Sequence, residues 1–265
     1  MLGLILYCFA YYFMGGVSMV LGYHRCLTHK AFKLKKGLEY ILIFIGLPSG
    51  SPIQWVGNHR FHHTHTDEEL DPHSPIVHGF WYSHNGWYIN SKKPVICFLY
   101  SIARPIRILV DVWVRPGTNE SHNHLAKDVS DDKFYNFISK PIIFRISLIL
   151  HVIISFGFAY YAWGIMGLLF LWLTLITISN LGDGVNSMAH KKDDNNSGQT
   201  VYNSQLWALF TFGDAFHADH HQQPNSAKLG FDAGKLDLGW KIILILKHLN
   251  LAYDIHTFKE VKIEK

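Results

Sequence analysis

Two long apolar stretches dominate the hydropathy pattern of the chain. Residues 1–23 contain no Asp, Glu, Lys or Arg, and none occurs in residues 146–182. About 20 apolar residues in a helix span the hydrocarbon core of a bilayer, so the first stretch predicts one transmembrane helix. The second stretch is long enough for two helices and is interrupted near residues 162–164. We therefore predict spans at residues 146–161 and 164–182 with a very short connection.

A third apolar stretch, residues 40–56, is broken by Gly46, Pro48, Gly50 and Pro52. Glycine and proline at this density interrupt a helix, which favours a partly inserted or interfacial segment over a complete span. The alternative for the first stretch is a cleaved signal peptide. It lacks the basic leading segment and the A-x-A cleavage site of such peptides.

The composition agrees with a membrane protein. The 265 residues are 49% hydrophobic and only 17% charged, whereas soluble domains average about 25% charged residues. Three cysteines, Cys8, Cys26 and Cys97, form no C-x-x-C pair, which argues against a disulfide framework or a thiolate zinc site. We predict one all-α domain, an integral membrane helical bundle of about three spanning helices plus a re-entrant or interfacial segment.

The basic residues indicate the topology. All 24 Lys and Arg lie between Arg25 and Arg145 or after Asp183. By the positive-inside tendency, residues 24–140 and 183–265 form a cytoplasmic cap, which we expect to be helical. Because membrane topology accounts for the distribution of the basic residues, we expect no nucleic-acid partner. The topology would leave Met1 outside at the start of a lone helix, so we expect a helix preceding it to be missing from this chain.

Histidine is the unusual residue, with 18 copies. Three clusters stand out: His24 to His29 (H-x-x-x-x-H), His59 to His63 (H-x-x-H-H) and His217 to His221 (H-x-x-H-H). On an α-helix, positions i, i+3 and i+4 share one face, so each H-x-x-H-H triplet directs its imidazoles the same way. Positions i and i+5 diverge by about 140°, which would let His24 and His29 serve two different metals. The pattern favours a dinuclear site.

An all-imidazole ligand set narrows the chemistry. Imidazole suits iron, copper, zinc and nickel, and the lack of cysteine ligands argues against iron–sulfur clusters. Soluble di-iron bundles use a Glu and Glu-x-x-His framework that this chain does not offer. The alternative is a non-catalytic membrane protein whose histidines hold zinc as a structural or storage site. Two closed four-ligand sites need eight ligands, and the candidates number nine once the histidine that a family resemblance adds below is counted.

The order of the boxes, with two apolar helices between the second and third, resembles the membrane fatty-acid desaturase family, and most of all its bacterial delta-9 type. The phrases that flank the boxes extend the likeness over nearly the whole chain: GYHR (22–25), DPHSP (71–75), GFWYSH (79–84), NSMAH (186–190) and LAYD (251–254). The boxes alone are shared with hydroxylases and ketolases. A fatty-acyl or alkyl hydroxylase on the same scaffold therefore remains the alternative enzyme.

The resemblance implies two ferrous ions, dioxygen as co-substrate, and desaturation of a long-chain fatty acyl group. It further implies a ninth histidine ligand, the last residue of the NSMAH phrase. It also implies that Asn186 acts through a water molecule and that Asp214, where the family usually has Glu, orients a ligand without binding the metal. We find no catalytic residues beyond the metal ligands. The implied ligand set is His24, His29, His59, His62, His63, His190, His217, His220 and His221.

The remaining histidines are expected to have other roles. We interpret His73 and His84, which belong to family phrases, as structural or substrate-facing, and we do not count His65 and His78 as ligands. The rest are predicted to be ordinary: His122, His124, His151, His248 and His256.

The positions before the second box depart from the family pattern. Animal acyl-CoA desaturases carry an Arg-Asp pair there that contacts the CoA head group, and this chain has Gly57 and Asn58. Losing that cation weakens recognition of CoA, so a membrane glycerolipid is the favoured acyl carrier and acyl-CoA the second. Ala215 likewise occupies a position near the third box that is often Gly.

No haem-binding or flavin-binding segment is visible, so we expect a separate electron donor such as ferredoxin or a cytochrome b5-like protein. Basic residues of the cap could attract an acidic donor, although such residues more often solvate a face or touch anionic lipid. The candidates are Lys33, Lys35, Lys36, Lys191 and Lys192. We predict a bacterial cytoplasmic membrane protein with its active site on the cytoplasmic side.

Overall fold

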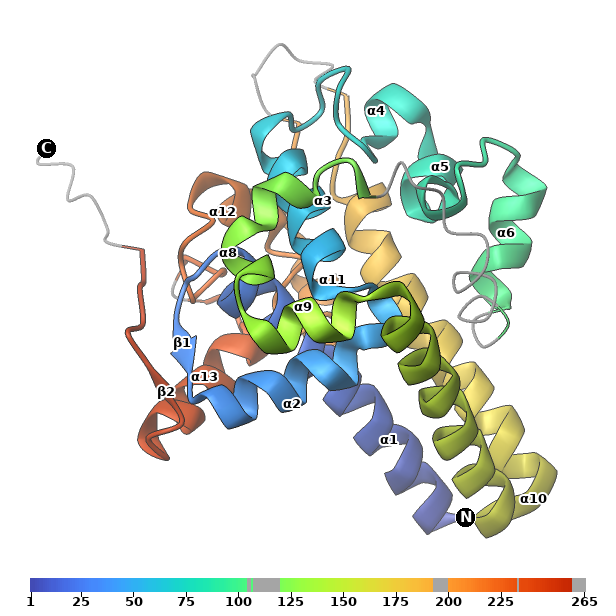
Figure 1. Cartoon of the computed structure of the whole chain (residues 1–265). Coiled ribbons are helices and arrows are strands. Elements are labelled where there is room, and N and C mark those ends of the chain that lie inside the picture. The colour runs from blue at the N-terminus through green and yellow to red at the C-terminus, as the bar shows by residue number, and fades with distance from the viewer. Residues whose placement is uncertain (104–105, 107–119, 193–199, 233, 259–265) are drawn as a thin grey trace, which may run out of the picture.

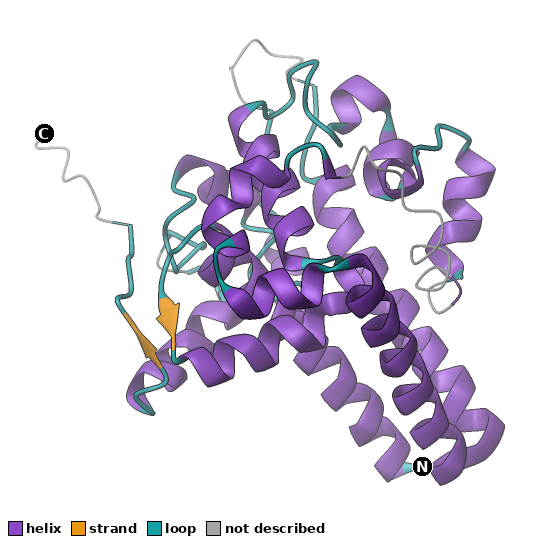
Figure 2. Ribbon diagram, viewed as in Figure 1, coloured by secondary structure: helices purple, strands orange, loops and turns teal. Residues whose placement is uncertain are grey.

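The computed structural model describes residues 1–103, 106, 120–192, 200–232 and 234–258. These residues are mostly helical, which confirms the predicted class, and their only sheet has two short strands (Figure 2). The longer elements are α1 (Leu2–Val17), the π-helix η1 (Ser18–Thr28), α2 (Lys36–Gly46), α3 (Pro52–Thr64), α6 (Pro94–Ile102), α10 (Pro141–Met188) and α13 (Leu238–His248).

The short elements connect these helices. The strands β1 (Lys33–Leu34) and β2 (Ala252–Tyr253) pair antiparallel. The short helices and 3₁₀ turns are η2 (Leu47–Ser49), α4 (Pro75–His78), α5 (Phe80–His84), η3 (Gly86–Ile89), η5 (Asn123–Ala126), α8 (Lys127–Ser130), α9 (Lys133–Ser139), α11 (Gln205–Phe210) and α12 (His217–Gln222).

Within the described residues, two helical stretches are long and apolar enough to cross a membrane: Leu2–Thr28, made of α1 and η1, and α10. The 48 residues of α10 do not form one rod, because Gly164 has φ 60° and ψ −144°. Only glycine adopts such a conformation without strain, and the chain reverses there. Figure 1 shows the first arm of α10 descending in olive and the second returning in yellow. α1 packs against α10.

Large apolar side chains cover the outer faces of these arms. Phe9 on α1 is 62% exposed, and Ile154 and Ile165 on the two arms of α10 are 67% and 70% exposed. Between the arms, Ala159, Leu171 and other residues form a buried cluster. Exposed apolar surface of this extent marks a contact with another apolar phase, so the arms associate with a membrane.

The other described residues form a cap at one end of the arms (Figure 1). Residues 40–56, predicted as a partly inserted or interfacial segment, form the end of α2, the turn η2 and the start of α3. α2 packs against η1 at the base of the cap. Two buried clusters join the cap to the arms, one through Tyr23, Ile43 and Leu148 and the other through Leu21 and Ile243.

Candidate metal centre

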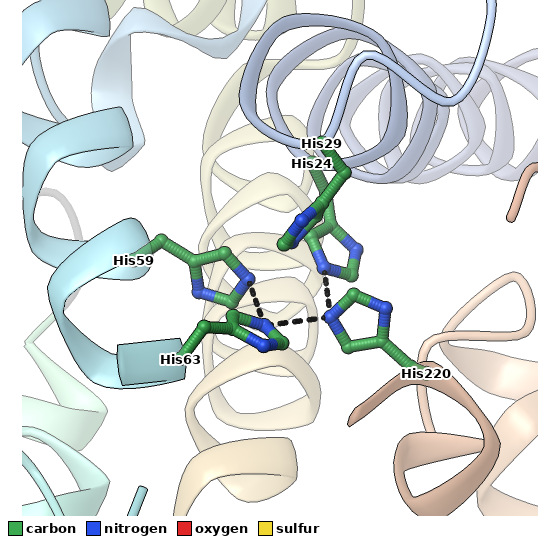
Figure 3. A group of neighbouring side chains, drawn as sticks. All are labelled: His24, His29, His59, His63 and His220. Carbon is green, nitrogen blue, oxygen red and sulfur yellow. Dashed lines mark hydrogen bonds between the residues drawn. The ribbon is translucent and has the colours of Figure 1, made fainter. Parts of the chain in front are cut away.

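The structure gathers all nine predicted ligands into two adjacent groups, although they come from four separate parts of the chain. In each group the candidate ligand atoms lie within 4.8 Å of one another. The first histidine cluster contains His24, His29, His59, His63 and His220 (Figure 3). The second histidine cluster contains His62, His190, His217 and His221.

The winding of η1 brings His24 and His29 together, contrary to the sequence-based expectation. In this π-helix the backbone N–H of His29 donates to the carbonyl of His24 at 3.1 Å. A bond between residues i and i+5 stacks them on one side of the helix. The two imidazole centroids lie 4.9 Å apart and both rings belong to the first histidine cluster. The prediction that these residues diverge toward two metals was wrong because it assumed an α-helix.

Each H-x-x-H-H box is shared between the two clusters. On α3, His59 and His63 join the first cluster and His62 the second; on α12, His217 and His221 join the second and His220 the first. Residues i and i+4 are about 40° apart around an α-helix. Residue i+3 is displaced from residue i in the opposite direction around the helix axis. One helical turn therefore supplies ligand candidates to both clusters.

His190 completes the second histidine cluster from the end of α10. Its Nε2 lies 2.9 Å from Nε2 of His217. A backbone bridge between His190 and Val201 fixes the chain where it leaves the helix. The ninth histidine, which only the family resemblance identified, thus lies among the other eight.

The nitrogens converge as the ligands of a common ion do. In the first cluster, Nε2 of His220 lies 2.9 Å from Nε2 of both His24 and His63. In the second, Nε2 of His221 lies 3.1 Å from that of His217 and 3.3 Å from that of His62. Two nitrogens bound to one ion at about 2.1 Å, at right angles, are about 3 Å apart. The residues present therefore fit a metal in each cluster.

Three aspartates accept hydrogen bonds from the opposite nitrogen of cluster histidines. Nδ1 of His24 lies 3.1 Å from Asp214, which therefore reaches the ring although its side chain is shorter than the family's usual Glu. Nδ1 of His62 lies 2.9 Å from Asp71. A proton held on Nδ1 by a carboxylate leaves the lone pair on Nε2, the atom that faces the cluster.

Nδ1 of His190 lies 2.9 Å from the third aspartate, Asp67. Sequence reasoning missed the positioning roles of Asp67 and Asp71. The segment from Thr66 to Asp71 (TDEELD) reads as a solvated acidic loop. The only signal was its closeness to the second box, which does not tell these two acids from the exposed Glu69.

Burial keeps the imidazoles of His59, His62, His63 and His220 neutral. Desolvation, followed by the repulsion that neighbouring charged rings would exert, lowers the pKa of His63 to about 3. The same causes lower the pKa of His59, His62 and His220 well below 6.5. A neutral imidazole is the form that binds a metal, so the clusters are prepared for cations.

Two arginines inside the boxes hold the boxes together. Arg25 is buried and donates to both carboxylate oxygens of Asp237, at 2.9 and 3.0 Å, and to the carbonyl of Phe212. It thereby joins the first box to the turn before the third. Arg60 donates to Asp128 at 2.6 Å and to the carbonyl of Thr28, which joins the second box to the end of the first.

The histidines excluded from the ligand set have other contacts. His73 is buried against the ring of His62, with centroids 4.4 Å apart, and also lines the cavity described below. His84 bonds to Ser187 and Asn180 on α10, each at 2.9 Å. His65 stacks on the ring of Phe61. His78 bonds to the carbonyl of Asp71.

A cavity extends from the histidine clusters to the membrane arms. His24, His59 and His217 line one part of it. A largely apolar part of its lining comes from α1, η1, the second arm of α10 and residues 210–212: Tyr12, Gly15, Gly16, Met19, Val20, Ile178, Phe210 and Phe212. Asn186 is in neither cluster but lines this cavity as well. An apolar chain in the cavity would lie directly beside the convergent nitrogens.

The position equivalent to the CoA-binding arginine has no room for a side chain. A Cβ atom on Gly57 would lie 2.4 Å from the carbonyl oxygen of His122, because α3 packs against η5 there. Asn58 is buried, lines the cavity and donates to the carbonyl of Gln54 at 2.8 Å. The replacement of this pair is therefore built into the packing of the cap.

Comparisons with known proteins agree with the arrangement. The family model described as "Fatty acid desaturase" matches residues 2–229. An acyl-CoA C20 Delta5-desaturase from Anemone leveillei is 34% identical, over 96% of this chain and 74% of its own. An sn-1 stearoyl-lipid 9-desaturase from Anabaena variabilis is 31% identical, over 92% of this chain and 80% of its own. Delta-9 acyl-lipid desaturase 1 from Arabidopsis thaliana is 32% identical, over 92% of this chain and 72% of its own.

Proposed function

The chain belongs to the fatty acid desaturase family and is an oxidoreductase that desaturates fatty acyl groups, and from that premise we propose that it acts at position 9 of a lipid-linked chain with two ferrous ions. The observation that carries this proposal is the pair of all-histidine clusters beside an apolar cavity that continues between the membrane arms. An acyl chain bound in this cavity would lie beside the convergent histidine nitrogens.

The ligand assignment follows the two histidine clusters. The first would hold one iron and the second the other, with Asn186 contributing through a water molecule from the cavity wall. Asp214, Asp71 and Asp67 would fix the tautomers of His24, His62 and His190. Ferrous ions with dioxygen supply the oxidising power needed to break unactivated C–H bonds.

The protein's own task is to position the substrate and exclude water. The wall contributed by α1 and the Ile178 and Leu181 side chains of α10 are largely apolar, so an extended acyl chain would replace water along them. Ser179, Asp183 and Asn186 of α10 add polar groups to the same cavity. His24 and His59 face this space, which brings adjacent methylenes within reach of the metal-binding nitrogens. The three carboxylates behind the rings also offset part of the positive charge of two divalent cations.

A membrane glycerolipid is the proposed acyl carrier. Gly57 leaves no room for the cation that would recognise CoA. The proposal of position 9 rests on similarity to the sn-1 stearoyl-lipid 9-desaturases of Anabaena variabilis and Synechocystis, while the Anemone leveillei relative is named as a Delta5 enzyme. The cavity supports an acyl chain in general, and its length and bend would select the carbon.

The proposed orientation places the cap and its clusters on the cytoplasmic side of a bacterial membrane, because the basic residues lie in the cap segments. A separate ferredoxin or cytochrome b5-like protein would supply electrons. Among the lysines considered for its docking, Lys33 pairs with Asp254 at 2.7 Å and Lys36 with Glu39 at 2.7 Å. Lys35, Lys191 and Lys192 are the remaining candidates for this docking, and Nζ of Lys191 lies 5.6 Å from the ring centroid of Tyr202.

Expression in a host that makes no unsaturated fatty acids tests the proposal. Mass spectrometry of intact lipids and of their fatty acids should find a double bond at carbon 9 of lipid-linked chains. A His63→Ala variant should yield none. A hydroxylated chain instead of an alkene would identify a hydroxylase, and zinc without any oxygen-dependent product would identify a non-catalytic metal protein; either outcome would refute the proposal.

A further inference from the structure

A second hollow lies on another face of the second arm of α10. Its walls include Phe80 and Trp81 on α5, Phe98 and Ile102 on α6, and Thr177 and Leu181 on α10. Residues 177 and 180 are about 100° or more around the helix from residues 178 and 182, which line the histidine cavity. We propose that this lateral groove binds an acyl chain of a membrane lipid beside that cavity.

The polar side chains of His84, Asn180 and Thr177 in the lateral groove are already paired with other protein groups. The two ring nitrogens of His84 lie 2.9 Å from Asn180 Oδ1 and from Ser187 Oγ. Asn180 Nδ2 donates to the carbonyl of Ser101 at 3.1 Å, and the hydroxyl of Thr177 donates to a carbonyl of its own helix. Among the described residues that line the groove none is charged. A hydrocarbon chain therefore suits this surface better than a polar head group.

The groove is continuous with the membrane-facing surface. On α6, Val95 and Leu99 are 70% and 53% exposed, and on α10 Leu173 is 59% exposed. Phe98 and Ile102, in the groove itself, are 47% and 40% exposed. An apolar groove that opens onto surface of this kind is already in contact with lipid chains, so its occupant needs no transfer through water.

Only a thin partition separates the groove from the histidine cavity. Leu181 lines both hollows. Trp207 also lines the groove, and its Nε1 donates to the carbonyl of Leu181 at 3.3 Å. This inference rests on the proposed lipid-linked substrate. The acyl chain of such a lipid would first bind in the lateral groove, and rotation of the Leu181 side chain would then admit it to the histidine cavity.

Photolabelling of the protein in nanodiscs tests this inference. The probe is a phosphatidylcholine that carries a diazirine in its acyl chain, and digestion followed by mass spectrometry locates the adducts. We expect adducts on residues 98–102 and 176–181. A Thr177→Trp variant should fill the groove, lose most of those adducts and desaturate lipid-linked chains more slowly. Leu169→Trp, which adds the same ring to an exposed position outside the groove, is the matched control.

Wild-type iron content and gel-filtration behaviour establish that the variants fold. If Thr177→Trp does not fold, Ile102→Trp fills the groove from its opposite wall and replaces it in the experiment. Lipid desaturation without adducts in the groove, or equal labelling of the filled variant and the control, would overturn the lateral groove and leave the proposed function intact. Adducts in the groove together with desaturation of acyl-CoA alone would sustain the binding site and refute the lipid-linked substrate.

Discussion

Asp71→Asn tests whether a carboxylate prepares the second histidine cluster for metal. Asp71 is 1% exposed, and its Oδ2 lies 2.9 Å from Nδ1 of His62 and 2.8 Å from the backbone nitrogen of Asp67. Its Oδ1 accepts from the backbone N–H of His73 at 3.0 Å. Asparagine has the same shape but only one acceptor oxygen, so an NH₂ group must face either His73 or both His62 and Asp67.

The magnitude follows from these contacts. If the NH₂ group faces His62, it favours the tautomer with the proton on Nε2, which cannot bind the metal. Loss of such a carboxylate partner typically lowers metal affinity about 10- to 100-fold, which corresponds to about 1.4–2.8 kcal/mol. The opposite orientation places two donors face to face at His73 and destabilises the buried loop by about 1–3 kcal/mol.

The assay is competition for ferrous iron against a chelator, under anaerobic conditions in detergent. Asp219→Asn is the matched control, because Asp219 is also a buried carboxylate in a histidine box but pairs with Lys235 at 2.9 Å. The control should lose thermal stability while it keeps its iron affinity. Wild-type iron affinity together with wild-type thermal stability in Asp71→Asn would refute the role assigned to the carboxylate, because either orientation of the amide must cost one of the two.

Three further outcomes are expected. Gly57→Ala should lower stability by about 1–3 kcal/mol in thermal unfolding, because its Cβ would overlap a backbone carbonyl; Gly37→Ala, with no atom within 4 Å, should not. Arg25→Met should destabilise by about 3–5 kcal/mol because it leaves Asp237 buried without its partner, and a normal melting curve would contradict this. Since burial lowers the pKa of His63 to about 3, the unfolded state of the metal-free protein binds more protons below pH 6.5. The Tm of the metal-free protein should therefore decrease as the pH is lowered from 7 to 5, and it should decrease less steeply in His63→Gln.

The sequence predicted the helical class and the nine histidines that the structure brings together. Local spacing sufficed for the six histidines of the two H-x-x-H-H boxes, because i, i+3 and i+4 relations operate within one or two helical turns. It identified His24 and His29 as candidates as well, but not the cluster that they share. His190 was found only through the family resemblance, since a single histidine in a polar segment has no local signal. Two distant pieces of chain must fold together before it meets His217.

What the sequence could not predict depends on tertiary packing. The π-helical winding that places His29 beside His24 has no simple residue signature. The roles of Asp67 and Asp71 depend on how the acidic loop folds back onto α3 and α10. The closure of position 57 by the backbone of His122 involves residues far apart in the chain, so only the folded structure reveals it.

The central claim is that two irons bind in the two histidine clusters and support desaturation. Metal analysis of purified protein, loaded anaerobically and checked for turnover, tests it most directly. We expect two irons per chain and a loss of both activity and iron in His220→Ala, which removes a ligand of the first cluster. Full desaturase activity with one iron per chain, or with unchanged iron in that variant, would contradict the account.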